Sequence, residues 1–108
     1  MGDLYLSLEV KGSWLYNDYS SFSRWINLVQ LAWHEPTKRL VGGALYDVPE
    51  GCVAIELKQL AEMWEIKNAD VNLFLSMLIE DKLATVTEEC GVLFINMLSR
   101  YVRICQDV

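Results

Sequence analysis

Hydrophobic residues recur at helical spacing in three stretches of the chain. The longest stretch follows Ser20 and Ser21, which are good N-cap residues, and its apolar positions cover much of the helix girth. Such a helix belongs in the centre of a core, and the Glu35-Pro36 step ends it because the residue before proline is pushed out of the α region. Its apolar positions are Phe22, Trp25, Ile26, Leu28, Val29, Leu31, Ala32 and Trp33.

Two shorter amphipathic stretches follow one another closely. Apolar residues fall at i, i+3, i+4 and i+7 from Leu57 to Trp64, and the same spacing returns from Val71 to Leu78. Residues 65–67 break the pattern, and Asn68 is placed as the N-cap of the second helix. Two short helices joined by a tight turn predict a helix-turn-helix, with Phe74 in the same core as Trp25.

Extended segments surround these helices. Residues 83–87 and 92–97 are β-prone and are joined by a predicted hairpin loop at residues 88–91, and a short strand is expected at residues 52–55 after a turn at Glu50-Gly51. Residues 4–10 are expected to form a strand or irregular arm, residues 12–18 to pack against the core, and residues 37–49 to form a loop leading into an extended piece. The order helix, strand, helix, helix, hairpin predicts an α+β winged-helix fold with an extra amino-terminal strand or arm and helix.

The composition agrees with one compact domain over residues 1–108. Hydrophobic residues make up 53% of the chain, and four Trp, five Tyr and three Phe supply bulky side chains for a core, which a disordered chain lacks. Three cysteines without CxxC spacing favour reduced thiols over a disulfide scaffold. The chain shows no apolar run of the ~20 residues that cross a bilayer and no signal-peptide pattern, so the cytoplasm is the expected location.

The net charge of -6, from fifteen acidic and nine basic side chains, bears on the partner. Nucleic-acid binders gain much of their affinity from Lys and Arg that neutralise phosphates, and anionic membranes attract the same residues. The acidic balance therefore lowers the expectation of DNA binding and disfavours a membrane partner.

Several loosely patterned elements together resemble a known family. They are Trp14 with Tyr16, Leu31-Ala32-Trp33-His34, Gly51 before a short strand, Leu60-Ala61 followed by Trp64, Val71-Asn72-Leu73-Phe74-Leu75 leading to Leu78, and Tyr101. The stretch from Trp14 to Tyr101 resembles the amino-terminal domain of phage replisome organisers and DnaD-like replication-initiation proteins. The resemblance implies a winged-helix fold of phage or mobile-element origin. It also implies a role in loading replication machinery at an origin, by DNA contact or by self-association. This chain departs from the family at the start of the second helix, where members usually place Arg or Lys and this chain has Asn68, Ala69, Asp70 and Asn72.

The candidate DNA contacts are few. Asn68 and Asn72 are the residues of the second helix that could read adenine, because major-groove readers use Arg or Lys for guanine and Asn or Gln for adenine. Lys38 and Arg39 lie in one predicted loop, and Arg100 and Arg103 are placed one helical step apart near the end of the chain. These four cations could contact phosphates of duplex DNA, or they could simply keep the surface soluble.

The second helix offers an apolar stripe in place of charge. Leu73 and Met77 lie one turn apart on the side opposite Val71 and Leu78, with Ala69 one turn before them. Two interpretations stay open: the stripe is covered and belongs to the core, or it is exposed as an interface for another protein or a second copy. Asp70, Glu80 and Asp81 would then form a polar rim.

Catalytic chemistry has little support. His34 is the one histidine and is placed at a helix end, with no Cys, Asp or second His at metal-ligand spacing. Glycines form no phosphate-binding loop. We therefore expect a binding module without enzymatic activity, cofactor, metal or small-molecule substrate.

Overall fold

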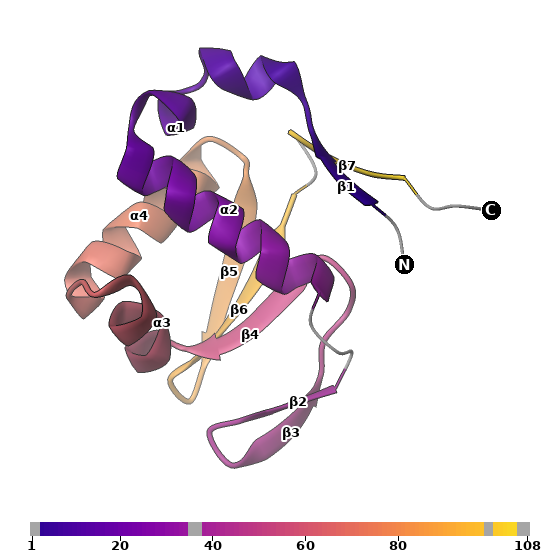
Figure 1. The fold of residues 1–108 in the computed structure, drawn as a ribbon. Helices are drawn as coiled ribbons and strands as arrows, with labels where there is room; N and C mark the ends of the chain where they lie inside the picture. The colour runs from indigo at the N-terminus through magenta and orange to yellow at the C-terminus, as the bar shows by residue number, and fades with distance from the viewer. Residues whose placement is uncertain (1–2, 35–37, 99–100, 106–108) are drawn as a thin grey trace.

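The fold is described from a computed structural model, which places residues 3–34, 38–98 and 101–105. It is a mixed α+β arrangement (Figure 1). In chain order its elements are β1 (Asp3–Leu6), the 3-10 helix η1 (Leu8–Gly12), α1 (Trp14–Asn17), α2 (Tyr19–His34), β2 (Lys38–Val41), β3 (Ala44–Asp47), β4 (Cys52–Glu56), α3 (Leu57–Trp64), α4 (Asn68–Glu80), β5 (Ala84–Glu89), β6 (Val92–Met97) and β7 (Val102–Cys105).

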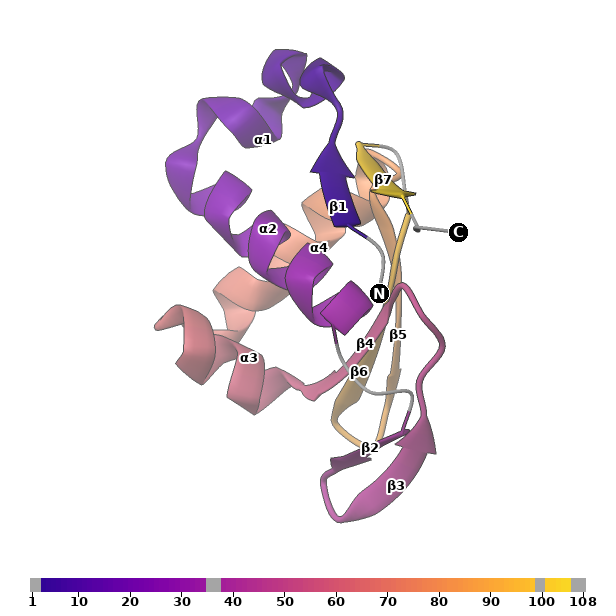
Figure 2. The same cartoon turned by 45° about the vertical axis from the view of Figure 1, so that its right-hand side comes forward.

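The main core lies between the helices and a three-stranded antiparallel sheet of order β4-β6-β5. Figure 2 shows the helices on one side of this sheet, and in Figure 1 α2 crosses in front of it. Trp25 and Leu28 of α2 are fully buried, and Phe74 of α4 joins them in the same cluster. The prediction of a central apolar helix that shares a core with Phe74 is confirmed.

The start of α2 differs from the prediction. The helix begins at Tyr19, and the Phe22 backbone N–H donates to the Asp18 carbonyl at 2.9 Å, so Ser20 and Ser21 lie inside the first turn and do not cap it. The Ser21 hydroxyl instead donates to the Asp18 carboxylate at 2.5 Å. Asp18 competes for the same role because its side chain is also a good acceptor at a helix start.

The turn between α3 and α4 also corrects one expectation. Glu65 takes a left-handed conformation (φ 56°), and the Ile66 backbone N–H donates to the Ala61 carbonyl at 3.0 Å, which closes α3 tightly. The chain then re-enters helical geometry sooner than predicted. Lys67 is the N-cap residue of α4, and Asn68 is already its first helical residue.

The β5–β6 hairpin is tighter than predicted. Glu88 and Glu89 continue β5, and Cys90 and Gly91 alone form the turn, with φ values of 53° and 80°. Positive φ at both central residues is the geometry of a type I′ turn, which matches the twist of the flanking strands. The predicted four-residue loop is therefore wrong at its first two positions.

A second hairpin, β2–β3, replaces the predicted loop before residue 44. Gly42 and Gly43 both have positive φ and form its turn. The hairpin contributes Val41 to a second apolar cluster with Val48, Ala54 and Val92, and Tyr46 packs edge-on against Phe94 at 5.1 Å. The sheet thus buries side chains on both faces, toward the helices and toward this cluster.

The strand or arm expected over residues 4–10 is a shorter strand, because β1 ends at Leu6 and the 3-10 helix η1 occupies Leu8–Gly12. β1 pairs antiparallel with β7, from Asp3 opposite Cys105 to Leu6 opposite Val102, and η1 follows. Residues 12–18 pack down as predicted, because Leu15 of α1 is fully buried in the main core and Trp14 packs against it.

Replacing Phe74 tests the assignment of the inward face of α4. We expect Phe74→Ala to lower the free energy of unfolding by about 3–5 kcal/mol, because truncating a buried Phe leaves a cavity. The matched variant Leu73→Ala, one residue away and 62% exposed, should change it by less than about 0.5 kcal/mol. Denaturant unfolding of both variants makes the comparison, and equal losses would reverse the assignment.

The hairpin turn provides a second stability test. Cys90→Asn should raise the free energy of unfolding by about 0.5 kcal/mol, because Asn adopts the left-handed conformation of a type I′ turn more readily than Cys. The control is Cys52→Asn on β4, where the side chain packs against the second apolar cluster and an amide should destabilise the fold. Thermal melts under reducing conditions measure both, and a lower melting temperature for Cys90→Asn would contradict the turn assignment.

Candidate functional site

The outward face of α4 carries an exposed apolar stripe. Leu73 is 62% exposed and Met77 is 40% exposed, while Val71, Phe74 and Leu78 are buried beneath them. Ala69, one turn before Leu73, is also exposed. The sequence left two interpretations open, a stripe buried in the core or a stripe exposed at the surface. The exposure of Leu73 excludes burial in the core for this residue. We call Ala69, Leu73 and Met77 the α4 stripe.

The α4 stripe runs into a groove of about 390 Å³ lined by Trp14, Met77, Glu80 and Asp81. We call it the α1–α4 groove, because Trp14 comes from α1, Met77 and Glu80 from α4, and Asp81 is the C-cap residue of α4. The Trp14 indole N–H donates to the Asp81 carboxylate at 3.0 Å, which ties the two walls together. Trp14 is half-buried, so part of its ring system remains accessible.

Phe74 supports this surface from below. Its ring contacts Trp14 edge-on with centroids 6.3 Å apart, and Trp64 of α3 edge-on at 5.6 Å. The Trp64 indole N–H donates to the Asn27 side-chain oxygen on α2 at 2.9 Å. Each indole therefore has its polar atom paired at the surface and its ring in the core, an arrangement that fixes α4 against α1, α2 and α3.

The charged side chains of α4 and its C-cap are all acidic. Residues 68–81 include Asp70, Glu80 and Asp81 and no Lys or Arg. Glu80 and Asp81 stand at the carboxyl end of the helix, where the helix dipole is already negative. The tip of the β5–β6 hairpin adds exposed Glu88 and Glu89. A helix and hairpin of this charge repel phosphates.

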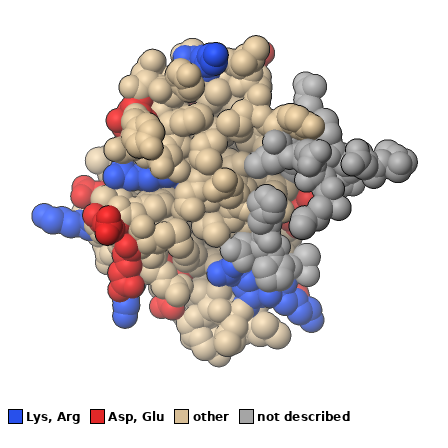
Figure 3. All heavy atoms as spheres, in the orientation of Figure 1, with Lys and Arg blue, Asp and Glu red and all other residues tan. Residues whose placement is uncertain are grey.

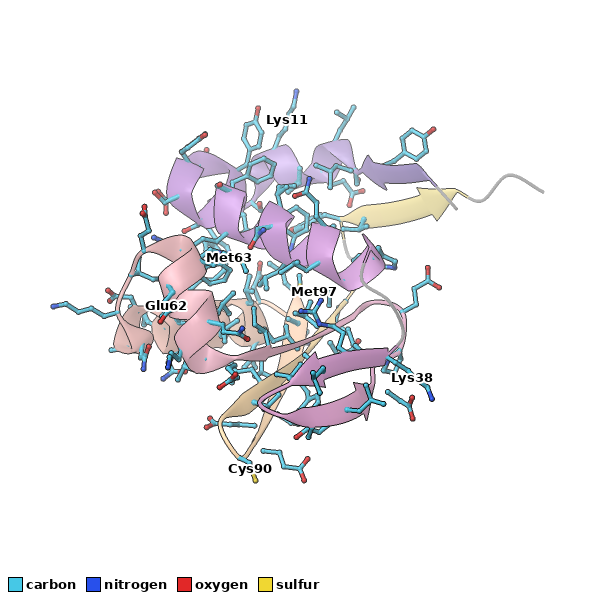
Figure 4. All side chains as sticks on the ribbon, turned by 60° about the horizontal axis from the view of Figure 1, so that its bottom comes forward. Lys11, Lys38, Glu62, Met63, Cys90 and Met97 are labelled. Atoms are coloured by element: carbon cyan, nitrogen blue, oxygen red, sulfur yellow. The ribbon has the colours of Figure 1, made fainter. Side chains whose placement is uncertain are left out.

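The candidate phosphate contacts lie elsewhere. Lys38 and Arg39 are on strand β2 rather than in a loop, because the Gly42-Gly43 turn pairs that segment with β3. Lys38 is exposed and lies 4.0 Å from Asp47, whereas Arg39 is half-buried on the side of the hairpin that packs. Figures 1 and 2 place this hairpin at the far end of the sheet from α4, and Figure 4 shows Lys38 at the start of β2, away from the hairpin turn.

Asn68 and Asn72 lie on a different element from Lys38 and Arg39. Asn68 and Asn72 are exposed on α4, beside the α4 stripe. Arg103 is on strand β7, where its backbone pairs with Tyr5. The prediction that Arg100 and Arg103 lie one helical step apart is therefore wrong for Arg103, because it is not in a helix. Its side chain and the whole of Arg100 lie outside the described residues. On the face in Figure 3, the described surface is largely uncharged at its centre, and charged side chains gather mainly at the left and lower margins.

A second hollow of about 350 Å³ lies between the start of α2 and the end of α3. Its walls include Tyr19, Arg24, Asn27 and Met63, and Figure 4 shows Met63 and Glu62 on α3. Sequence reasoning missed both hollows, because each needs residues from two helices far apart in the chain. The available signal was Trp14, which lies outside the regular apolar spacing that includes the other three tryptophans.

Groups suited to metal or proton chemistry are sparse in the described part of the chain. No cluster of three His, Cys, Asp or Glu side chains there could hold a metal ion. Burial raises the pKa of the Cys52 thiol, which lowers its reactivity, and the thiol donates to the Asn96 side-chain oxygen at 3.5 Å. His34 is the last residue of α2, and its side chain lies outside the described residues.

No protein-family model matches the chain, and neither curated proteins nor solved structures provide a match. Among the described residues, no helix has the length and apolar character to span a membrane.

Titration with duplex DNA tests whether the acidic α4 and β5–β6 hairpin tip prevent tight DNA binding. At about 0.15 M salt we expect dissociation constants no tighter than about 10 μM, within the range of non-specific binding. Glu88→Lys with Glu89→Lys should strengthen binding, because the hairpin tip then attracts phosphates. Tight, steeply salt-dependent binding by the unmodified protein, lost on replacing Lys38, Arg39, Arg100 and Arg103 with Ala, would contradict the expectation.

Proposed function

We propose that this chain is a winged-helix domain that works by binding another protein or a second copy of itself, and not by catalysis. The observation that carries the proposal is the exposed α4 stripe on a helix without cations. Exposed contiguous apolar residues with a polar rim are typical of interfaces, and methionine adapts well to irregular partner surfaces.

The winged-helix assignment rests on order and pairing. Helix α2 is followed by β4, then by α3 and α4 joined through a tight turn, then by the β5–β6 hairpin. β4 pairs with β6, so the strand before the two helices closes the sheet with the hairpin. These features support a helix-turn-helix with a wing, to which β1, η1, α1 and the β2–β3 hairpin are additions.

The resemblance to phage replisome organisers and DnaD-like proteins supplies the biological setting of the proposal. In that setting the domain would act in the cytoplasm during replication initiation, and α4 would dock onto a component of the replication machinery. Direct DNA binding at an origin or operator is the alternative from the same family. The acidic α4 and hairpin tip favour the protein contact over it.

Light scattering over a concentration series tests docking through α4. The average mass of the wild type should rise with concentration, and more so at 0.5 M than at 0.05 M salt, because salt screens repulsion between acidic rims. Leu73→Glu with Met77→Glu should keep the circular dichroism spectrum and abolish the rise, because two carboxylates would then stand in the apolar contact.

The matched control is Leu8→Glu with Met63→Glu, which introduces the same charge at positions 77% and 47% exposed on other elements. This variant should associate as the wild type does. Unfolding of the Leu73/Met77 variant would show that the stripe is core. Identical association of all three proteins would overturn self-association through α4.

A further inference from the structure

We infer that the α1–α4 groove binds a lysine or arginine side chain presented by a basic segment of a different protein. This inference rests on the proposed function, because it specifies the partner of the same surface. It identifies Trp14, Met77 and Glu80 as the residues that select the partner.

Charge is the first argument. None of the four residues that line the groove is a cation, and two are carboxylates. They stand at the negative end of α4, so the helix dipole adds to their potential. Lys82 follows Asp81 but takes a left-handed turn toward β5 and does not line the groove. Among the described residues, no Lys or Arg lies within ion-pair distance of Glu80.

The chemistry of the walls is the second argument. A cation close to the face of a tryptophan is attracted by the ring, and Trp is the best of the aromatic residues for this contact. Met77 provides an apolar surface for the methylene stem of Lys or Arg. Asp81 is positioned by the Trp14 indole, and Glu80 is exposed at the rim. The groove therefore offers a ring, an apolar wall and a carboxylate to one cationic side chain.

The α4 stripe adds a second requirement, for an apolar residue on the partner at a set distance from the cation. Leu73 lies one turn before Met77, so an apolar partner residue should sit about one helical turn away from the cation. A basic amphipathic helix has this spacing and could lay its apolar face along α4.

The same charges make a basic segment a better occupant of the groove than a second copy of the chain or a nucleic acid. In a symmetric dimer through α4, Asp70, Glu80 and Asp81 would face the same residues of the second copy or lie near them. Such like-charge contacts are unfavourable until salt screens them. Nucleic-acid phosphates would meet the same repulsion.

The test uses the full chain and three synthetic helical peptides of about 15 residues. The first carries one Leu and one Arg four residues apart on one face of an alanine-based helix. In the second, citrulline replaces Arg and keeps its shape without its charge, and in the third Glu replaces Arg. NMR titration follows the Trp14 indole N–H and the backbone signals of Leu73, Met77 and Glu80. The Arg peptide should shift these signals, the citrulline peptide should bind about tenfold more weakly, and the Glu peptide should not bind.

Paired protein variants assign the charge effect to the groove. Glu80→Gln should weaken binding of the Arg peptide roughly threefold to fivefold. Glu62→Gln removes the same charge from exposed α3 and should leave binding unchanged. Leu73→Glu with Met77→Glu, already a test of the interface, should remove the shifts along α4.

Equal binding of the Arg and citrulline peptides along α4 would overturn the basic partner while leaving the apolar interface intact. Shifts confined to other acidic sites, such as Glu88 and Glu89, or no shift at millimolar Arg peptide, would overturn the groove assignment. If the wild type and the Leu73/Met77 variant give the same light scattering while the Arg peptide still shifts the Trp14 signal, only self-association is excluded.

Discussion

The packing of Phe74 between Trp14 and Trp64 holds the outward face of α4 in position. The three rings come from α1, α3 and α4, and the two indole N–H groups reach Asp81 and Asn27 at the surface. Rigid aromatic packing of this kind leaves little freedom for α4 to rotate. The α4 stripe is therefore presented by a fixed helix, which lowers the entropy cost of docking.

The hydrogen bond between the Trp14 indole and Asp81 explains why the site has one apolar and one acidic end. Trp14 must keep its N–H at the surface to reach Asp81, and this places an indole beside two carboxylates. Residues that stabilise the fold thus also shape the groove. On the other face of the sheet, the β2–β3 hairpin covers Ala54 and Val92 and itself exposes Leu40 and Leu45.

Local patterns in the sequence predicted much of this architecture. The spacing of Trp25, Leu28 and Phe74 identified the core, because burial on one face of a helix is a periodic signal. The β2–β3 hairpin escaped prediction although Gly42-Gly43 is a known turn signal, since its flanking strands are only four residues long and lack alternation. The α1–α4 groove could not be predicted, because the contact between Trp14 and Asp81 joins residues 67 positions apart.

The pairing of β1 with β7 has a consequence for the order in which the molecule assembles. It joins Asp3 to Cys105, so nearly the whole chain forms the loop that must close before these strands meet. Tyr5 and Leu6 of β1 are exposed, so these two side chains bury little apolar surface to compensate for that closure. These strands should therefore join last and separate first, with backbone amides that exchange with solvent well before those of α4. Because the Ser7 N–H donates to the Tyr101 carbonyl at 2.8 Å and Tyr101 packs edge-on against Trp25, this local opening would loosen one wall of the core while the remaining helices stay folded.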